Sequence, residues 1–234
     1  MRTIGLIGGM SFESTEVYYR LINEMVRARL TGFASADLMM HSVNFAEIVK
    51  LQKSGRWDLA GKILSDSAKR LEAGGAQCIL ICANTMHLVA ADVAAAASIP
   101  LIHIIDETAK TLAGKGLARP LLLATRYTME QGFYTDRMKL LGMDVMVPDA
   151  DDRTALHNLI FDELCVGKVT ESARSKTLAI IEKAKAAGAD SVILGCTELC
   201  LLLDPDNLAL PGIDSAAVHA QAAVEFSLSP DTAG

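Results

Sequence analysis

The chain has 234 residues, of which 51% are hydrophobic and 21% charged, a composition typical of a globular protein with a substantial core. Its net charge of -6 argues against a nucleic-acid-binding surface. Because the sequence contains no apolar run of the roughly 18 residues that a membrane-spanning helix needs, we expect neither nucleic acid nor a membrane as a partner.

The cysteines indicate a reducing environment. There are five of them, an odd number, in mostly apolar surroundings, which favours the cytoplasm over an extracellular disulfide framework. The sequence enters a predicted strand soon after Met1, so we expect no secretory signal. Cys196 and Cys200 lie four residues apart without a histidine cluster, and we therefore expect no metal.

In the first part of the chain, short apolar runs alternate with amphipathic stretches. Helical periodicity and β-rich runs distinguish the two kinds of element. They predict strands at 4–7, 36–43, 78–82 and 99–105, and helices at 14–30, 46–51, 57–73, 90–97 and 106–113.

The second part of the chain repeats this alternation. It predicts strands at 120–124, 143–148 and 191–194, and helices at 129–141, 154–163, 170–187 and 218–226. Strands separated by helices predict parallel sheets with right-handed crossovers, and hence an α/β protein of two pseudo-symmetric α/β/α halves. We expect halves at 1–114 and 115–207, with the segment from about 208–234 packing back on the first.

One segment of the chain occurs twice. Residues 74–85 align without gaps with residues 187–198, and each copy has a helix-ending glycine, an apolar run and a polar tip. The second tip opens with Cys196, whereas the first has Ala83 at the matching position. Because ligands collect at the carboxyl edges of parallel strands, the repeat predicts a site in a cleft shared by the two halves.

Cys196 is the strongest candidate for a reactive group. It lies between a strand and a predicted helix start, where backbone N–H groups and the helix dipole favour a thiolate. Lowering its pKa from about 8.5 by a unit or two would give a useful base at neutral pH. The alternative interpretation is a buried structural cysteine.

Several polar residues at strand ends have two interpretations. Asn84, Thr85, Thr125 and Thr128 suit either carboxylate binding or helix capping. His87 suits either catalysis or a core position.

Two further segments have simpler interpretations. Gly8-Gly9-Met10-Ser11 lacks the third glycine of a dinucleotide loop and the lysine of a P-loop, so we expect it to approach a small ligand instead. The charged stretch from Asp149 to Arg153 predicts a solvated loop.

Taken together, the motifs closely resemble the aspartate/glutamate racemase family. The resemblance runs in order from Thr3 to about Ala223. It rests on Leu6-Ile7-Gly8-Gly9-Met10-Ser11, Ala83-Asn84-Thr85-Met86-His87, Thr125-Arg126-Tyr127-Thr128-Met129-Glu130, Gly195-Cys196-Thr197-Glu198, Pro148-Asp149 with Asp162-Glu163-Leu164, and Leu210-Pro211 with Ile213-Asp214-Ser215 through His219.

The resemblance implies a cofactor-independent racemase that acts on a small amino acid or dicarboxylate, usually as a homodimer, without pyridoxal phosphate or metal. In this family one cysteine removes the substrate α-proton and a second cysteine returns a proton to the opposite face. It implies that Cys196 is the acid/base residue, supported by Glu198 and His219. It also implies substrate contacts at Met10, Ser11, Gln52, Asn84, Thr85, Thr125, Thr128, Lys168 and Thr197.

Ala83 departs from the family pattern, which has a cysteine there. Cys82 is no substitute, because adjacent strand residues point to opposite faces. We therefore expect an aspartate/glutamate-type racemase in which Cys196 serves one face and a water or Thr85 the other. The alternatives are a single-thiol decarboxylase or isomerase of a related dicarboxylate, a non-catalytic dicarboxylate binder, and a constructed substitution at Ala83.

Overall fold

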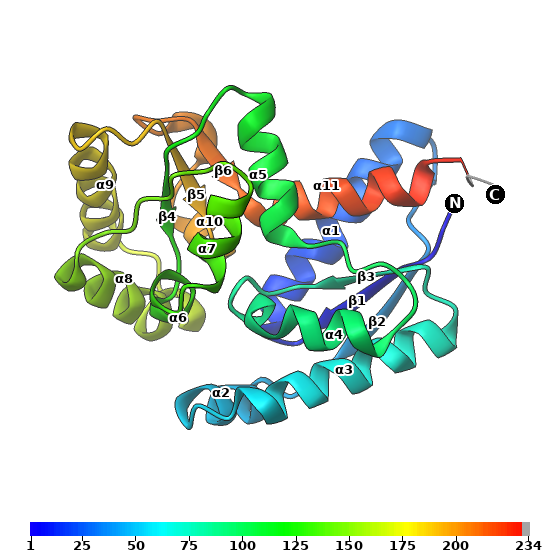
Figure 1. The fold of residues 1–234 in the computed structure, drawn as a ribbon. Helices are drawn as coiled ribbons and strands as arrows, with labels where there is room; N and C mark the ends of the chain where they lie inside the picture. The colour runs from blue at the N-terminus through cyan, green and yellow to red at the C-terminus, as the bar shows by residue number, and fades with distance from the viewer. Residues whose placement is uncertain (231–234) are drawn as a thin grey trace. The chain divides into compact units, whose positions relative to one another are not determined.

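The computed structural model describes residues 1–230, which divide by their contacts into two compact units. The first unit contains Met1–Ile104 and the stretch that begins at His219, and the second contains Ile105–Val218. Each unit contains a three-stranded sheet in which neighbouring strands run parallel, with helices around it (Figure 1). The predicted α/β class with parallel sheets in two units is confirmed.

The sheet of the first unit has the order β2-β1-β3, with β1 in the centre. Ile4 of β1 is paired with Leu38 of β2 and Cys78 of β3. Helix α1 lies on one side of this sheet and α3 with α4 on the other (Figure 1). The strands are β1 (Ile4–Gly8), β2 (Leu38–Ser42) and β3 (Cys78–Ile81); the helices are α1 (Phe12–Leu30), α2 (Phe45–Lys53), α3 (Trp57–Gly74), the 3₁₀ helix η1 (Thr85–Val89) and α4 (Ala90–Ala96).

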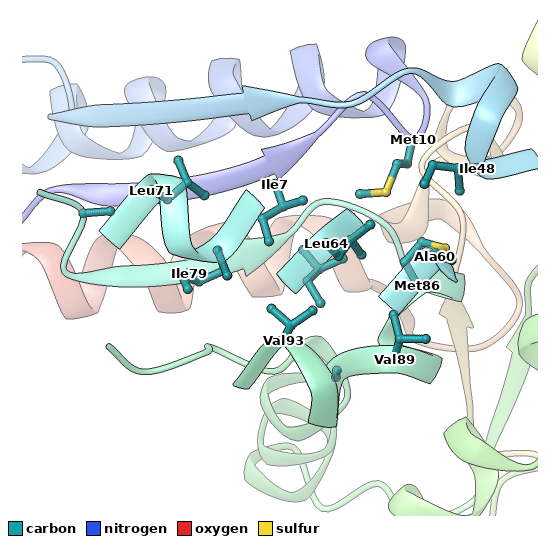
Figure 2. Close-up of a cluster of buried hydrophobic side chains, with 14 residues drawn as sticks. Ile7, Met10, Ile48, Ala60, Leu64, Leu71, Ile79, Met86, Val89 and Val93 are labelled. Atoms are coloured by element: carbon teal, nitrogen blue, oxygen red, sulfur yellow. The ribbon is translucent and has the colours of Figure 1, made fainter. Parts of the chain in front are cut away.

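Apolar side chains between the sheet and α3 form the core of the first unit (Figure 2). Ile7, Ile79 and Leu64 are each 0% exposed in this cluster. Full burial of a side chain of this size stabilises a fold by about 1.5–3 kcal/mol. At one end the cluster reaches Met10 and Met86, so the core continues into the loops that follow β1 and β3.

The sheet of the second unit has the order β4-β5-β6. Leu121 pairs with Val192, and Val192 in turn with Gly212. The elements of this unit are α5 (Ile104–Gly114), β4 (Pro120–Leu123), α6 (Arg126–Glu130), α7 (Phe133–Leu140), α8 (Ala150–Asp162), η2 (Leu164–Val166), α9 (Glu171–Ala186), β5 (Ser191–Leu194), α10 (Leu199–Leu202), η3 (Pro205–Asn207) and β6 (Gly212–Asp214). The last helix, α11 (Ser215–Leu228), belongs to the first unit from His219 onward.

Several elements differ from the sequence-based expectation. The expected strand at 99–105 is only a bridge between Leu101 and Ile79, because α5 begins at Ile104, and the expected strand at 143–148 is likewise one bridge at Met146. The expected helix at 129–141 is instead α6 and α7, separated at Gly132, whose φ of 77° no helix accommodates. Strand β6 is too short to produce a periodic signal.

The expected solvated loop at 149–153 is wrong. These residues form the start of α8, where the Asp149 side chain accepts a hydrogen bond from the Asp152 backbone N–H at 2.9 Å. A carboxylate is a favourable cap for the exposed N–H groups of a helix start. The charged run therefore belongs to a helix rather than to a loop.

The contact division falls at Ile104 and Val218, whereas the sequence placed the boundaries of its halves at 114 and 207. Helix α5 is joined to α7 of the second unit by the Asp106–Arg137 ion pair. The start of the chain is joined to α11, since the Arg2 backbone N–H donates to the Ser227 carbonyl at 2.9 Å. Within residues 1–230, no helix combines the length and apolarity needed to cross a membrane.

Candidate active site

The loop after β1 is fixed by contacts within the chain. The Gly9 N–H donates to Thr15 Oγ1 at 2.8 Å, and Ser11 caps α1 by accepting from the Ser14 N–H at 3.2 Å. A Cβ at Gly9 would lie 2.3 Å from the Val43 carbonyl oxygen, and Gly9 has a φ of 85°. The glycine is thus required by the loop's own packing and conformation rather than by a ligand. Met10 is buried in the core cluster.

The loop after β3 contains the tip that opens with Ala83. Cys82 is 0% exposed, and burial raises the pKa of its thiol far above the ordinary value. It therefore remains a protonated thiol inside the fold. The half-buried Ala83 packs against the core cluster and offers only a methyl group. Neither residue supplies an acid/base group at this tip.

His87 is a buried histidine whose two ring nitrogens both have hydrogen-bond partners, one of them the carbonyl of Ala83 in the same loop. It is 4% exposed, and its Nδ1 lies 2.9 Å from the Ala83 carbonyl oxygen. The Ile104 backbone N–H points to Nε2 at 3.3 Å. Since a backbone N–H only donates, Nε2 is the acceptor and Nδ1 carries the proton. No sequence pattern predicts this second contact, because it joins residues 17 positions apart in the chain.

The remaining first-unit candidates lie close to this tip. Gln52 and Asn84 are both buried, and Gln52 Nε2 donates to Met86 Sδ at 3.2 Å. Met86 shares the core cluster with Met10 (Figure 2). Thr85 begins η1 and is half-buried. The structure thus brings Gln52 near the loops that follow β1 and β3.

In the second unit, two threonines follow β4. Thr125 immediately precedes α6, and its Oγ1 lies 3.2 Å from that of Thr128. Both side chains are buried. The Arg126 N–H of the same loop donates to His157 Nδ1 of α8 at 3.3 Å.

Cys196 lies in the loop after β5 and is hydrogen-bonded to a carboxylate. Its Sγ donates to Glu198 Oε2 at 2.8 Å, and Thr197 Oγ1 donates to the same oxygen at 2.9 Å. Cys165 Sγ, from η2, donates to the other oxygen, Oε1, at 3.7 Å. The predicted residues Cys196, Thr197 and Glu198 therefore form one hydrogen-bonded group, to which the structure adds Cys165.

The expected thiolate at Cys196 is wrong for the protein without substrate. Burial is the larger cause that raises the pKa of the Cys196 thiol well above its ordinary value, and the Glu198 carboxylate raises it further. The helix that follows, α10, has only four residues, so it offers little dipole to oppose these effects. The Cys196 thiol is consequently protonated at neutral pH.

The structure shows other contacts for two residues to which the family resemblance assigned roles at the substrate site. Lys168 lies in an exposed turn after η2, where its backbone N–H donates to the Glu163 carbonyl. His219 is 0% exposed and has its partners in the first unit: Tyr18 Oη donates to Nδ1, and Nε2 donates to the Ile102 carbonyl, both at 2.8 Å. Burial lowers the pKa of His219 to about 3, so the ring is neutral.

No group of three or more histidine, cysteine, aspartate or glutamate side chains suited to a metal ion occurs within residues 1–230.

The fold corresponds to that of solved racemase-family structures. A Yersinia pestis protein assigned as an Asp/Glu racemase is 45% identical, with a TM-score of 0.92 over 98% of this chain and 100% of that one. A Pyrococcus horikoshii aspartate racemase homologue is 35% identical, with a TM-score of 0.87 over 98% and 100%. The broad specificity amino-acid racemase RacX of Bacillus subtilis is 27% identical over 72% of each chain.

The sequence profile of the Asp/Glu/Hydantoin racemase family matches residues 7–223. The chain belongs to this family, and the resemblance expected from its motifs is confirmed. Because racemases are isomerases, the expected enzyme class is confirmed as well.

Proposed function

We propose that the protein is a cofactor-independent racemase of a small acidic amino acid of the aspartate/glutamate type. The observation that carries the proposal is the hydrogen bond of 2.8 Å from Cys196 Sγ to Glu198 Oε2. This pair couples a thiol to a proton acceptor, as α-proton transfer requires. The aspartate and glutamate specificities named for structural relatives support the choice of substrate.

The pair accounts for proton transfer in both directions. When Cys196 acts as the acid, its thiol proton passes to the α-carbanion and the sulfur becomes a thiolate. When it acts as the base, Glu198 first accepts the thiol proton, and the thiolate then removes the α-proton of the substrate. In each direction one proton moves to or from carbon, and no electron acceptor is needed.

The opposite face of the α-carbon requires a different group. Ala83 has no transferable proton, so a water molecule or the hydroxyl of Thr85, two residues on, serves this face. Either is a poorer acid/base group than a thiol, because its pKa lies farther from neutral pH. We therefore expect slow or directionally biased racemisation.

Hydroxyl and amide donors would hold the substrate. We assign the α-carboxylate to Asn84, Thr85, Thr125, Thr128 and Thr197, whose donors also stabilise the charge that develops on it after proton abstraction. Gln52 and Lys168 are assigned to the side-chain carboxylate, and Met10 and Ser11 shape the loop beside it. We also propose a cytoplasmic homodimer; light scattering in solution tests the oligomeric state.

Exchange of the substrate α-proton in heavy water tests the proposal. Both enantiomers of aspartate and glutamate are incubated with the enzyme, and deuterium at the α-carbon is followed by NMR. We expect exchange from the face served by Cys196 to be much faster than from the other. The matched control, Cys196→Ser, should abolish the fast exchange. Tight binding without exchange would instead support a dicarboxylate-binding protein.

A one-thiol reaction is the second candidate, and Ala83 is the observation that favours it. Decarboxylation of a disubstituted malonate needs only a single proton donor after carbon dioxide leaves, and Cys196 is protonated at neutral pH. Release of carbon dioxide from such a substrate, without exchange on amino acids, would support this reaction over racemisation.

A further inference from the structure

Both carboxylate oxygens of Glu198 accept hydrogen bonds. Oε2 accepts from Cys196 and Thr197, whereas Oε1 accepts from Cys165 at 3.7 Å. Glu198 is 8% exposed, so these donors replace much of the water that would otherwise solvate it. Cys165 comes from η2, 33 positions away in the chain, and all four residues belong to the second unit.

Two donors on one oxygen do not by themselves fix a carboxylate. The terminal torsion of a glutamate side chain has a broad, roughly two-fold energy profile, so the group rotates readily. A donor on the other oxygen, supplied by a different element, defines the plane of the carboxylate. Even a weak S–H donor suffices where the acceptor is charged.

We propose that Cys165 is a positioning residue for the reactive thiol: its hydrogen bond to Oε1 holds the Glu198 carboxylate with Oε2 turned toward Cys196. Cys165 acts through Glu198 and touches no substrate. The inference relies on the proposed function only for the catalytic use of Cys196, because the positioning itself is a property of the protein without substrate.

The surrounding charges determine the sign of the expected effect. Besides Cys165 and Glu198, Cys200 on α10 and Asp214 on β6 form a second thiol–carboxylate pair within electrostatic range of Glu198. A thiolate at Cys196 must form beside the negative charge of Glu198. Glu198 and Cys165 both raise the pKa of the Cys196 thiol, so loss of the Cys165 donor, which lets the Glu198 carboxylate rotate away, should make the thiolate easier to form.

Alkylation of Cys196 across pH 7–10 tests the proposal without requiring turnover. Iodoacetamide is the probe, and the labelled Cys196 peptide is quantified by mass spectrometry. In Cys165→Ala we expect the alkylation profile to move down by about one pH unit, which speeds labelling about tenfold at a given pH. An unchanged profile, or one that moves to higher pH, would overturn the proposal.

Two further variants separate positioning from packing. Cys165→Ser keeps a donor and should restore most of the wild-type profile, whereas Cys165→Val fills the space without a donor and should behave like alanine. The matched control is Cys78→Ala, a buried cysteine of the first unit, which should leave the profile in place. If Cys165→Ala fails to fold, the serine and valine variants decide the question.

Turnover then distinguishes this inference from the proposed function. If the chain is a racemase, Cys165→Ala should lower kcat with little change in KM, because substrate contacts are intact. If the racemase proposal fails, the alkylation shift is still expected. Loss of the shift in an active racemase would refute only the positioning role.

Discussion

The methyl group of Ala83 and the thiol of Cys196 occupy matching positions of the internal repeat, but their surroundings differ as much as their chemistry. Ala83 packs against an apolar cluster, and its carbonyl oxygen is held by His87. Cys196 donates a hydrogen bond to the Glu198 carboxylate, and burial together with that carboxylate keeps the thiol protonated. At the scale of the residue, the two tips therefore differ in kind: the first offers a methyl group and a fixed backbone carbonyl, and the second a thiol hydrogen-bonded to a carboxylate.

Restoring a thiol in the first unit should make the chemistry more symmetrical. We expect Ala83→Cys to raise the slower of the two α-proton exchange rates at least about tenfold, because a thiol is a better acid/base group than water or a hydroxyl. Deuterium exchange on both enantiomers measures this. Ala83→Ser is the matched control of similar size. Equal rates for Ala83→Cys and the parent protein would indicate that the first tip does not serve the substrate.

His87 should contribute to stability through its two buried hydrogen bonds. His87→Ala leaves the Ala83 carbonyl and the Ile104 N–H without this partner, at a cost of about 1–3 kcal/mol for each buried group. We expect a decrease of about 2–6 kcal/mol in the free energy of unfolding, measured by urea denaturation. The control is His41→Ala, a half-buried histidine bonded to Ser67, which should cost less than His87→Ala.

At the scale of the element, long amphipathic helices and fully buried strands were predictable, because each has a repeating pattern of its own. The pattern is reliable for α3, whose buried face includes Leu64 and Leu71. It fails for β6, which has three residues, and for the segment that contains Leu101, where an apolar run makes only one bridge before α5 begins. Short elements depend on partners that no local pattern records.

The start of α8 offers a test at this scale. Asp149→Ala removes the side chain that accepts from the Asp152 N–H, and loss of such a cap typically costs about 1 kcal/mol. We expect that loss in the free energy of unfolding. Asp151→Ala, an exposed acidic residue in the first turn of the same helix, is the matched control and should cost less. A larger loss in the control would refute the assignment of Asp149 as the cap.

At the scale of the whole molecule, a buried neutral histidine makes stability depend on pH. The pKa of His219 is lowered to about 3 in the folded protein, below the ordinary value of 6.5. Between these values the unfolded chain binds more protons than the folded one, so protonation favours unfolding. Stability is therefore retained above pH 6.5 and is lost as the pH falls toward 3.

Unfolding measured from pH 7 to pH 4 tests this. The free energy of unfolding should fall with pH, with His219 contributing a slope of at most about 1.4 kcal/mol per pH unit. His219→Gln removes this contribution while leaving that of the carboxylates in place. The difference between the two slopes isolates His219, and identical slopes would show that the ring is not protected from protonation.

The family, the α/β class, the repeat and the polar residues at the predicted strand ends could all be inferred without a structure, because they depend on local periodicity and on the order of short motifs. Tertiary structure decided the state of those residues. It desolvated the Cys196 thiol, so the thiol is protonated rather than ionised, and it joined His87 to the Ile104 N–H, which makes His87 a structural residue. Burial and hydrogen-bond partners set a pKa, and both depend on segments far apart in the chain.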